Sequence, residues 1–77
     1  MGKEMKGYMV SIAYYYKTDN TVERTNIYVE VPSDLDVELR YKQATDRAVK
    51  FAHEKFGWDT KQVIAFEVIP VWNAEKN

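Results

Sequence analysis

Two residues in the second half of the chain could belong to a metal-dependent active site. His53 and Glu54 are spaced like the start of a zinc-protease helix, in which two histidines hold the metal and the glutamate acts as a base. The second histidine of that motif would fall at Gly57, so the motif is incomplete. The chain has one histidine and no cysteine, which excludes zinc sites built from several histidines or from cysteines. We expect His53 to lie near a helix C-terminus, where a positive charge compensates the helix dipole.

An acidic cluster offers the other candidate chemistry. Asp34, Asp36 and Glu38 could act as acid–base carboxylates or bind a hard cation. They follow Ser33, a residue type that caps helix N-termini, and negative charge is favoured in the first turn of a helix. Helix capping therefore explains the cluster better than catalysis. Ser11 and Ser33 lack a histidine partner for nucleophilic catalysis, so we expect neither enzyme activity nor a metal or cofactor.

Length, composition and charge describe one small domain. The chain has 77 residues, 45% of them hydrophobic, which favours a folded core over disorder. Its 11 Lys+Arg and 12 Asp+Glu give a net charge of -1, so no overall attraction to nucleic acid or anionic membranes is expected. Neither a signal peptide nor a long apolar run is present, and with the lack of cysteine this predicts a cytoplasmic protein. We expect a single domain over 1–77 with frayed ends at 1–6 and 73–77.

The first half of the chain predicts a β-hairpin. Residues 8–17 and 22–31 are rich in aromatic and β-branched residues and alternate between apolar and polar types. Turn-forming residues separate them, and a two-residue turn at 19–20 would place Val10 opposite Val29. A slip by one residue would mix the apolar and polar sets, so burial should fix which side chains share a face.

A helix is predicted over residues 34–56. Pro32 ends the second strand, Ser33 is the expected N-cap and Gly57 the left-handed C-cap. Apolar residues spaced by three and four form its buried stripe, which consists of Val37, Tyr41, Ala44, Ala48, Phe51 and Ala52. Charges of alternating sign recur every fourth residue on the opposite side, at Glu38, Lys42, Asp46, Lys50 and Glu54.

Residues 62–71 predict a third strand, with Pro70 marking an edge or an end. A right-handed crossover from the second strand makes the third strand parallel to the second one. We expect it to lie beside the first strand, antiparallel to it. The predicted fold is therefore α+β, a ββαβ chain with a three-stranded sheet in the order 2-1-3 and one helix on one face.

One helix leaves the other face of the sheet uncovered, and that face is unusually apolar. A sheet face open to water normally carries polar residues at alternate positions. Strict alternation along the strands assigns seven apolar or aromatic residues to it: Met9, Ala13, Tyr15, Tyr28, Val63, Ala65 and Ile69. This pattern predicts a partner-binding or dimer interface. The alternatives are that the chain ends fold back over the face or that a small domain tolerates exposed apolar groups.

The expected function is a small non-enzymatic domain that binds protein, dimerises and acts as an accessory regulator or inhibitor. Pairing along the free edge of the second strand is a second route to a dimer. The rival hypothesis is a single-stranded nucleic-acid binder that stacks bases on Tyr15 and Tyr28 and contacts phosphates through Arg24 and Lys17. The carboxylates of Glu30 and Glu67 on the same face disfavour that rival.

Overall fold

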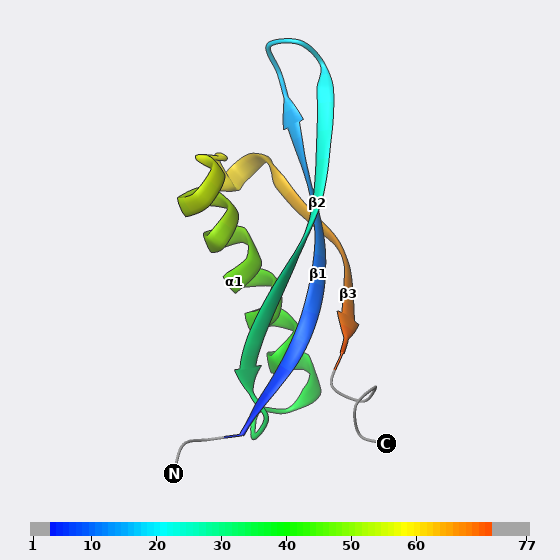
Figure 1. Cartoon of the computed structure of the whole chain (residues 1–77), viewed down its shortest axis with the longest axis vertical. Coiled ribbons are helices and arrows are strands. Elements are labelled where there is room, and N and C mark those ends of the chain that lie inside the picture. The colour runs from blue at the N-terminus through cyan, green and yellow to red at the C-terminus, as the bar shows by residue number, and fades with distance from the viewer. Residues whose placement is uncertain (1–3, 72–77) are drawn as a thin grey trace.

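A computed structural model of the chain describes residues 4–71 (Figure 1). The elements follow in the order ββαβ, with a short 3-10 helix η1 before the last strand. Their bounds are β1 Met5–Tyr16, β2 Thr21–Pro32, α1 Val37–Phe56, η1 Thr60–Gln62 and β3 Val63–Pro70.

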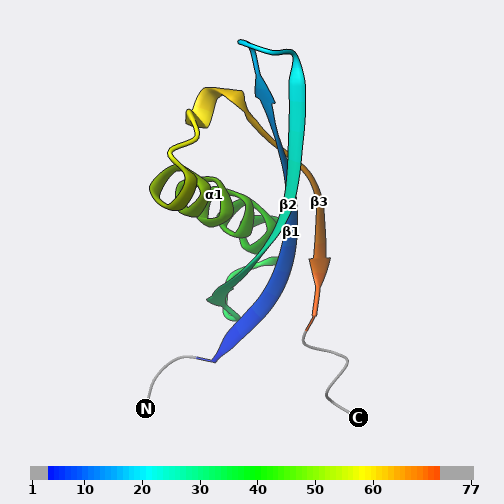
Figure 2. The ribbon, with the colours of Figure 1, turned by 45° about the horizontal axis from the view of Figure 1, so that its top comes forward.

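The three strands form one sheet in the order β2-β1-β3, and β1 pairs antiparallel with both neighbours. The α1 helix lies on one side of this sheet (Figure 2). Fold class, strand order and the position of the helix are therefore as the sequence predicts. Met5 and Lys6, expected to belong to a frayed end, are the first residues of β1, whereas 1–3 and 72–77 lie outside the described residues.

The hairpin register differs from the predicted one by two residues. Tyr16 pairs with Thr21, so the connection is a four-residue loop over 17–20 instead of a two-residue turn. Asn20 takes the left-handed conformation there, with φ of 58°, which asparagine tolerates better than most residues. Val10 consequently lies opposite Ile27 and not Val29. A shift by two residues keeps every side chain on its predicted face, because side chains alternate with a period of two.

The core forms where the first two strands meet the helix. Its buried residues on the sheet are Tyr8, Val10, Ile12, Ile27 and Val31, and those on the helix are Ala44, Ala48 and Ala52. Alanines at this spacing let the helix backbone approach the sheet closely. The predicted stripe is only partly right, because Val37 and Phe51 are exposed and Tyr41 sits at its margin, with its ring edge-on to Tyr8 at 5.2 Å.

The helix begins three residues later than predicted. Asp36, not Ser33, is the N-cap, and its carboxylate accepts a hydrogen bond from the main-chain N–H of Leu39 at 3.0 Å. The preceding loop is held by Arg40, which donates to the carbonyl oxygens of Ser33 and Leu35 and to the Tyr8 hydroxyl. Asp36, the central residue of the acidic cluster, therefore has a structural role as the helix cap.

The helix ends as predicted, at Gly57 in the left-handed conformation with φ of 76°. The next residue, Trp58, is buried and stacks on Tyr14 of β1 with ring centroids 4.7 Å apart. Its indole N–H donates to the Tyr16 hydroxyl at 3.0 Å. Trp58 therefore fastens the C-terminal end of α1 to the hairpin.

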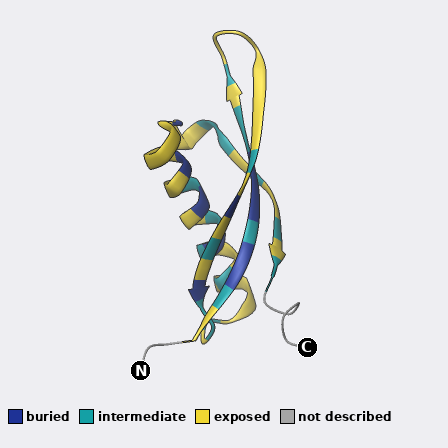
Figure 3. Cartoon of the chain, in the orientation of Figure 1, coloured by how far each residue is buried: buried dark blue, intermediate teal, exposed yellow. Residues whose placement is uncertain are grey.

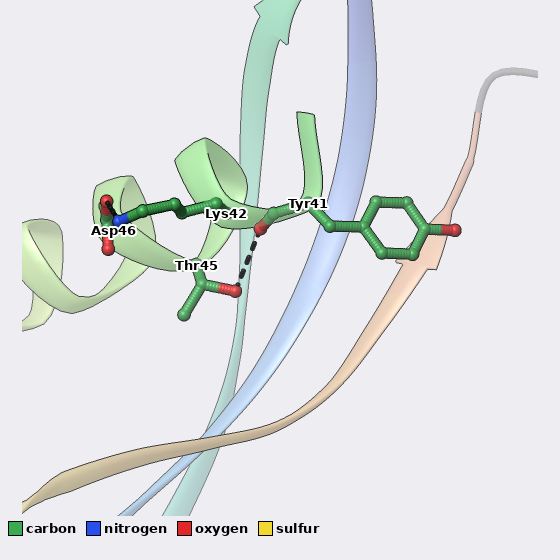
Figure 4. Close-up of polar contacts among 4 residues, drawn as sticks. All are labelled: Tyr41, Lys42, Thr45 and Asp46. Carbon is green, nitrogen blue, oxygen red and sulfur yellow. Dashed lines mark hydrogen bonds and ion pairs between the residues drawn. The ribbon is translucent and has the colours of Figure 1, made fainter. Parts of the chain in front are cut away.

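The outer side of the helix carries the predicted charges. Lys42 and Asp46, four residues apart, form an exposed ion pair with an N–O distance of 3.4 Å (Figure 4). Thr45 turns its hydroxyl back to the main-chain oxygen of Tyr41, whose ring projects away from the ion pair (Figure 4). Such exposed pairs contribute only about 0.3–0.5 kcal/mol each, so this side of the helix serves mainly to keep it solvated.

Candidate functional site

The candidate site is the sheet face that the helix does not cover. Along β1 the even-numbered residues point to the helix, so Met9, Ser11, Ala13 and Tyr15 point the other way. No helix or strand of residues 4–71 lies over this side of the sheet (Figure 2). We call it the open face, and its members by strand pairing are Met9, Ser11, Ala13, Tyr15, Val22, Arg24, Asn26, Tyr28, Glu30, Ile64, Glu67 and Ile69. We assign Phe66 to it as well, because this side chain is exposed and the β3 residues packed against the core are Val63, Ala65 and Val68.

Large apolar and aromatic side chains on the open face are exposed to a degree unusual for their type. Tyr28 is 51% exposed, Ile64 63% and Phe66 54%. Tyr15, Val22 and Ile69 are exposed as well, and much of β3 and the hairpin tip is drawn as exposed in Figure 3. These residues lie on all three strands, so the exposed apolar groups are spread over the whole face and not confined to one edge.

The structure corrects the predicted composition of this face at two positions. Val63 and Ala65 were expected on it, but they pair with Tyr14 and Ile12 and pack against the core beneath the helix. The cause is a β-bulge at Phe66, which adds one residue to β3 opposite β1 and reverses the alternation on its two sides.

The bulge exchanges these side chains for larger ones. Ile64 pairs with Ala13 and so takes the open face, and the bulge residue Phe66 is exposed next to it. The other predicted members, Met9, Ala13, Tyr15, Tyr28 and Ile69, lie on the open face as expected. The face is therefore more apolar than the sequence pattern predicts.

A polar row crosses the middle of this surface. Ser11 on the central strand lies between Asn26 of β2 and Glu67 of β3. The serine is almost enclosed, at 8% exposure, and donates a hydrogen bond to the Asn26 side-chain oxygen at 2.8 Å. The rows on either side are mainly apolar, so one polar row divides the apolar surface of the open face into two parts.

Tyr28 lies flat on the open face because Gly7 leaves room for it. A Cβ atom at Gly7 would lie 2.6 Å from Cε1 and 2.8 Å from Cζ of the Tyr28 ring, well inside normal contact. The Tyr28 hydroxyl donates to the Glu30 carboxylate at 2.9 Å, which fixes the direction of the ring. The Tyr28 ring therefore covers the main chain at Gly7, which has no side chain of its own.

At the hairpin end, the open face borders a concavity of about 390 Å³ lined by Tyr15, Lys17, Asp59, Lys61, Gln62 and Ile64. Gln62 donates to the main-chain oxygen of Tyr15 at 3.4 Å. Tyr15 and Lys17 were predicted from the sequence as nucleic-acid contacts, but Lys61 was not, because it lies 44 residues from Lys17 along the chain.

On the helix side of the same hairpin, the hydrogen bond that Tyr16 donates to the Glu23 carboxylate raises the pKa of Tyr16. Only the neutral phenol can donate this bond, so folding favours the protonated form. Because the folded-state pKa is the higher one, the contribution to stability is present below the ordinary tyrosine pKa and is lost as pH rises through the folded value.

Two of the groups considered for catalysis have structural partners. His53 lies in the last turn of α1, where its Nδ1 is 2.9 Å from the main-chain oxygen of Trp58. Asp36 caps the helix. Within residues 4–71, no three His, Asp or Glu side chains are grouped as a metal site would need.

Comparisons with known proteins identify no relative of this chain. No family model matches the chain, and no curated protein or solved structure is similar to it at a significant level. In the part of the chain that the structure describes, no helix has the length and apolar character to cross a membrane.

Proposed function

We propose that this chain is a small non-enzymatic protein-binding domain that forms a homodimer through the open face. The observation that carries the proposal is the spread of exposed apolar side chains over all three strands on the side opposite the helix. Burying such side chains contributes about 25 cal/mol for each Å² of apolar surface removed from water. A second copy of the chain presents a surface of the same size with the same apolar and polar rows.

The dimensions of the face suit a weak dimer. Nine residues of β1 at about 3.3 Å each and three strands at about 4.8 Å spacing give a flat footprint of roughly 400 Å². Standard interfaces take about 800 Å² of accessible surface from each partner, so this one belongs at the small end of the range. We therefore expect reversible dimerisation at micromolar to high micromolar concentration.

The free edges of the sheet support face-to-face pairing over edge-to-edge pairing. On β3 the bulge at Phe66 and the proline at Pro70 disfavour an added strand. On β2 the Arg47 side chain donates to the main-chain oxygen of Glu30 and so occupies one strand carbonyl. The alternative is a dimer paired along the β2 edge, and sedimentation of a variant distinguishes it from the face-to-face dimer.

Sedimentation velocity over about 5–500 μM tests the proposal with Phe66→Glu as the disrupting variant. Wild type should shift from monomer to dimer, and Phe66→Glu should stay monomeric because its carboxylate would be trapped in an apolar interface. Glu54→Gln, on the exposed side of α1, is the control and should behave as wild type. A wild type that is monomeric throughout contradicts the proposal. A dimer that survives Phe66→Glu indicates pairing along the β2 edge.

The biological role proposed for this dimer is that of an accessory regulator or inhibitor in the cytoplasm. A chain of 77 residues without cysteine gains nothing from an oxidising compartment, and self-association is another way to support a small core. Such a domain acts by occupying the surface of another protein.

A second candidate function, binding of single-stranded nucleic acid, is favoured by the concavity at the hairpin end. Tyr15 supplies an aromatic surface there, and Lys17 and Lys61 supply two positive charges. Binding should weaken steeply with salt and should fall when Tyr15→Ala or Lys61→Gln is introduced. Fluorescence anisotropy with labelled oligonucleotides at low salt measures it, and no binding at tens of micromolar protein ends this candidate.

A further inference from the structure

A charged residue in the polar row of the open face restricts how two copies can pair. Glu67 is exposed on β3, in the polar row with Ser11 and Asn26. Within residues 4–71 it makes no hydrogen bond or ion pair, and the same holds for Arg24 on β2. A second copy over this face would remove water from the Glu67 carboxylate, so a stable pairing must supply donors to it.

The two-fold axis of a face-to-face dimer must lie in the plane of the interface, and two of its orientations keep the strands of the two sheets aligned. An axis across the strands stacks β3 on the partner's β3, which leaves Glu67 facing apolar side chains or the partner's own Glu67. An axis along β1 stacks β3 on the partner's β2 instead. In this second arrangement each row lies over the same row of the partner, so the polar row meets the polar row and the mainly apolar rows meet each other.

We infer that the dimer pairs with its two-fold axis along β1, so that Glu67 of each protomer is held by the partner's Asn26 and the partner's Arg24. This inference rests on the proposed function. Asn26 shares the row of Glu67, and Arg24 lies one row further, about 7 Å along the strand and within reach of a long arginine side chain. The same axis places Tyr28 over the partner's Ile69, so an aromatic ring covers an exposed aliphatic side chain.

Complementary charge reversal tests this geometry. Arg24→Glu and Glu67→Arg each place like charges together at both symmetric contacts, and each should weaken the homodimer at least tenfold. When the two variants are mixed in equal amounts, one contact of the heterodimer is of the wild-type kind and the other has the charges exchanged. The mixture should therefore recover dimerisation to within a few-fold of wild type, measured by sedimentation velocity.

The mixture also separates a broken interface from a misfolded chain, because a misfolded variant cannot be rescued by another variant. Mixing Arg24→Glu with Glu30→Arg is the discriminating control, since Glu30 lies at the far end of β2 and meets Arg24 only if the axis runs across the strands. Recovery with Glu30→Arg but not with Glu67→Arg overturns the axis along β1. A wild-type dimer insensitive to both reversals overturns it as well, whereas a monomeric wild type removes the proposed function itself.

Discussion

The two faces of the sheet are built from similar residues but differ in what covers them. The helix side contains Ile12 and Ile27, both buried, and the open face contains Ile64 and Ile69, both exposed. The difference comes from the helix, whose alanines at 44, 48 and 52 leave space for the larger side chains of the sheet. Apolar residue types alone therefore do not mark the core, because the core lies where a complementary second layer is available.

The helix covers its own face unevenly. Side chains of β1 and β2 beneath it, such as Val10 and Val31, are fully enclosed. The helix-side residues of β3, Val63, Ala65 and Val68, are only partly buried. β3 therefore has exposed apolar surface on both sides, and we expect it to be the least stable strand of the monomer and the one that gains most from a partner.

The largest difference between the faces should appear when the same side chain is shortened on each. Ile12→Ala removes a fully enclosed side chain and should lower the free energy of unfolding by about 2–5 kcal/mol, because a cavity is left. Ile69→Ala on the open face should cost less than about 1 kcal/mol. Urea denaturation at low micromolar concentration, where the monomer predominates, measures both. Equal losses would mean that the open face is covered within the monomer.

Periodicity identified the elements of this fold more reliably than their exact alignment. The hairpin and the helix ending at Gly57 follow from alternation, spacing and a left-handed cap, which are local signals. The strand order follows from the rule for crossover connections. The loop at 17–20 and the cap at Asp36 were misplaced because several neighbouring residues suit those roles equally well. The first error was harmless to the face assignment, since it shifted the register by two.

The bulge at Phe66 had the larger consequence for the candidate site. Nothing in the sequence around it, such as a glycine, marks an extra residue in β3. Since one added residue reverses the alternation, Val63 and Ala65 were assigned to the wrong face and Ile64 was missed. Pairing with a distant strand determined the outcome, and a single sequence does not contain that information.

Val63 and Ile64 are neighbours in the sequence but lie on opposite faces of β3, so substitutions at these two positions test the alternation that the bulge produces. Val63→Glu should place a carboxylate against the core and lower the free energy of unfolding by about 2 kcal/mol or more. Ile64→Glu should leave the monomer within about 0.5 kcal/mol of wild type but abolish the dimer. Denaturation gives the first effect and sedimentation the second. The opposite ranking of the two variants would place the bulge elsewhere in β3.

The smallest effect is expected at Gly7, where the open face is shaped by one aromatic ring. In Gly7→Ala the new methyl group would overlap the Tyr28 ring, which must swing away and give up its hydrogen bond to Glu30. Because that ring is half exposed it can move at little cost, and replacing glycine in a strand recovers about 0.5–1 kcal/mol of chain entropy. We therefore expect monomer stability within about 0.5 kcal/mol of wild type, but a dimer several-fold weaker, because Tyr28 no longer covers the partner's Ile69.

Tyr28→Ala alone should weaken the dimer similarly, and adding Gly7→Ala to it should change nothing further, since both act through the same ring. If the two effects instead add, Gly7 influences the interface by a route other than the position of Tyr28.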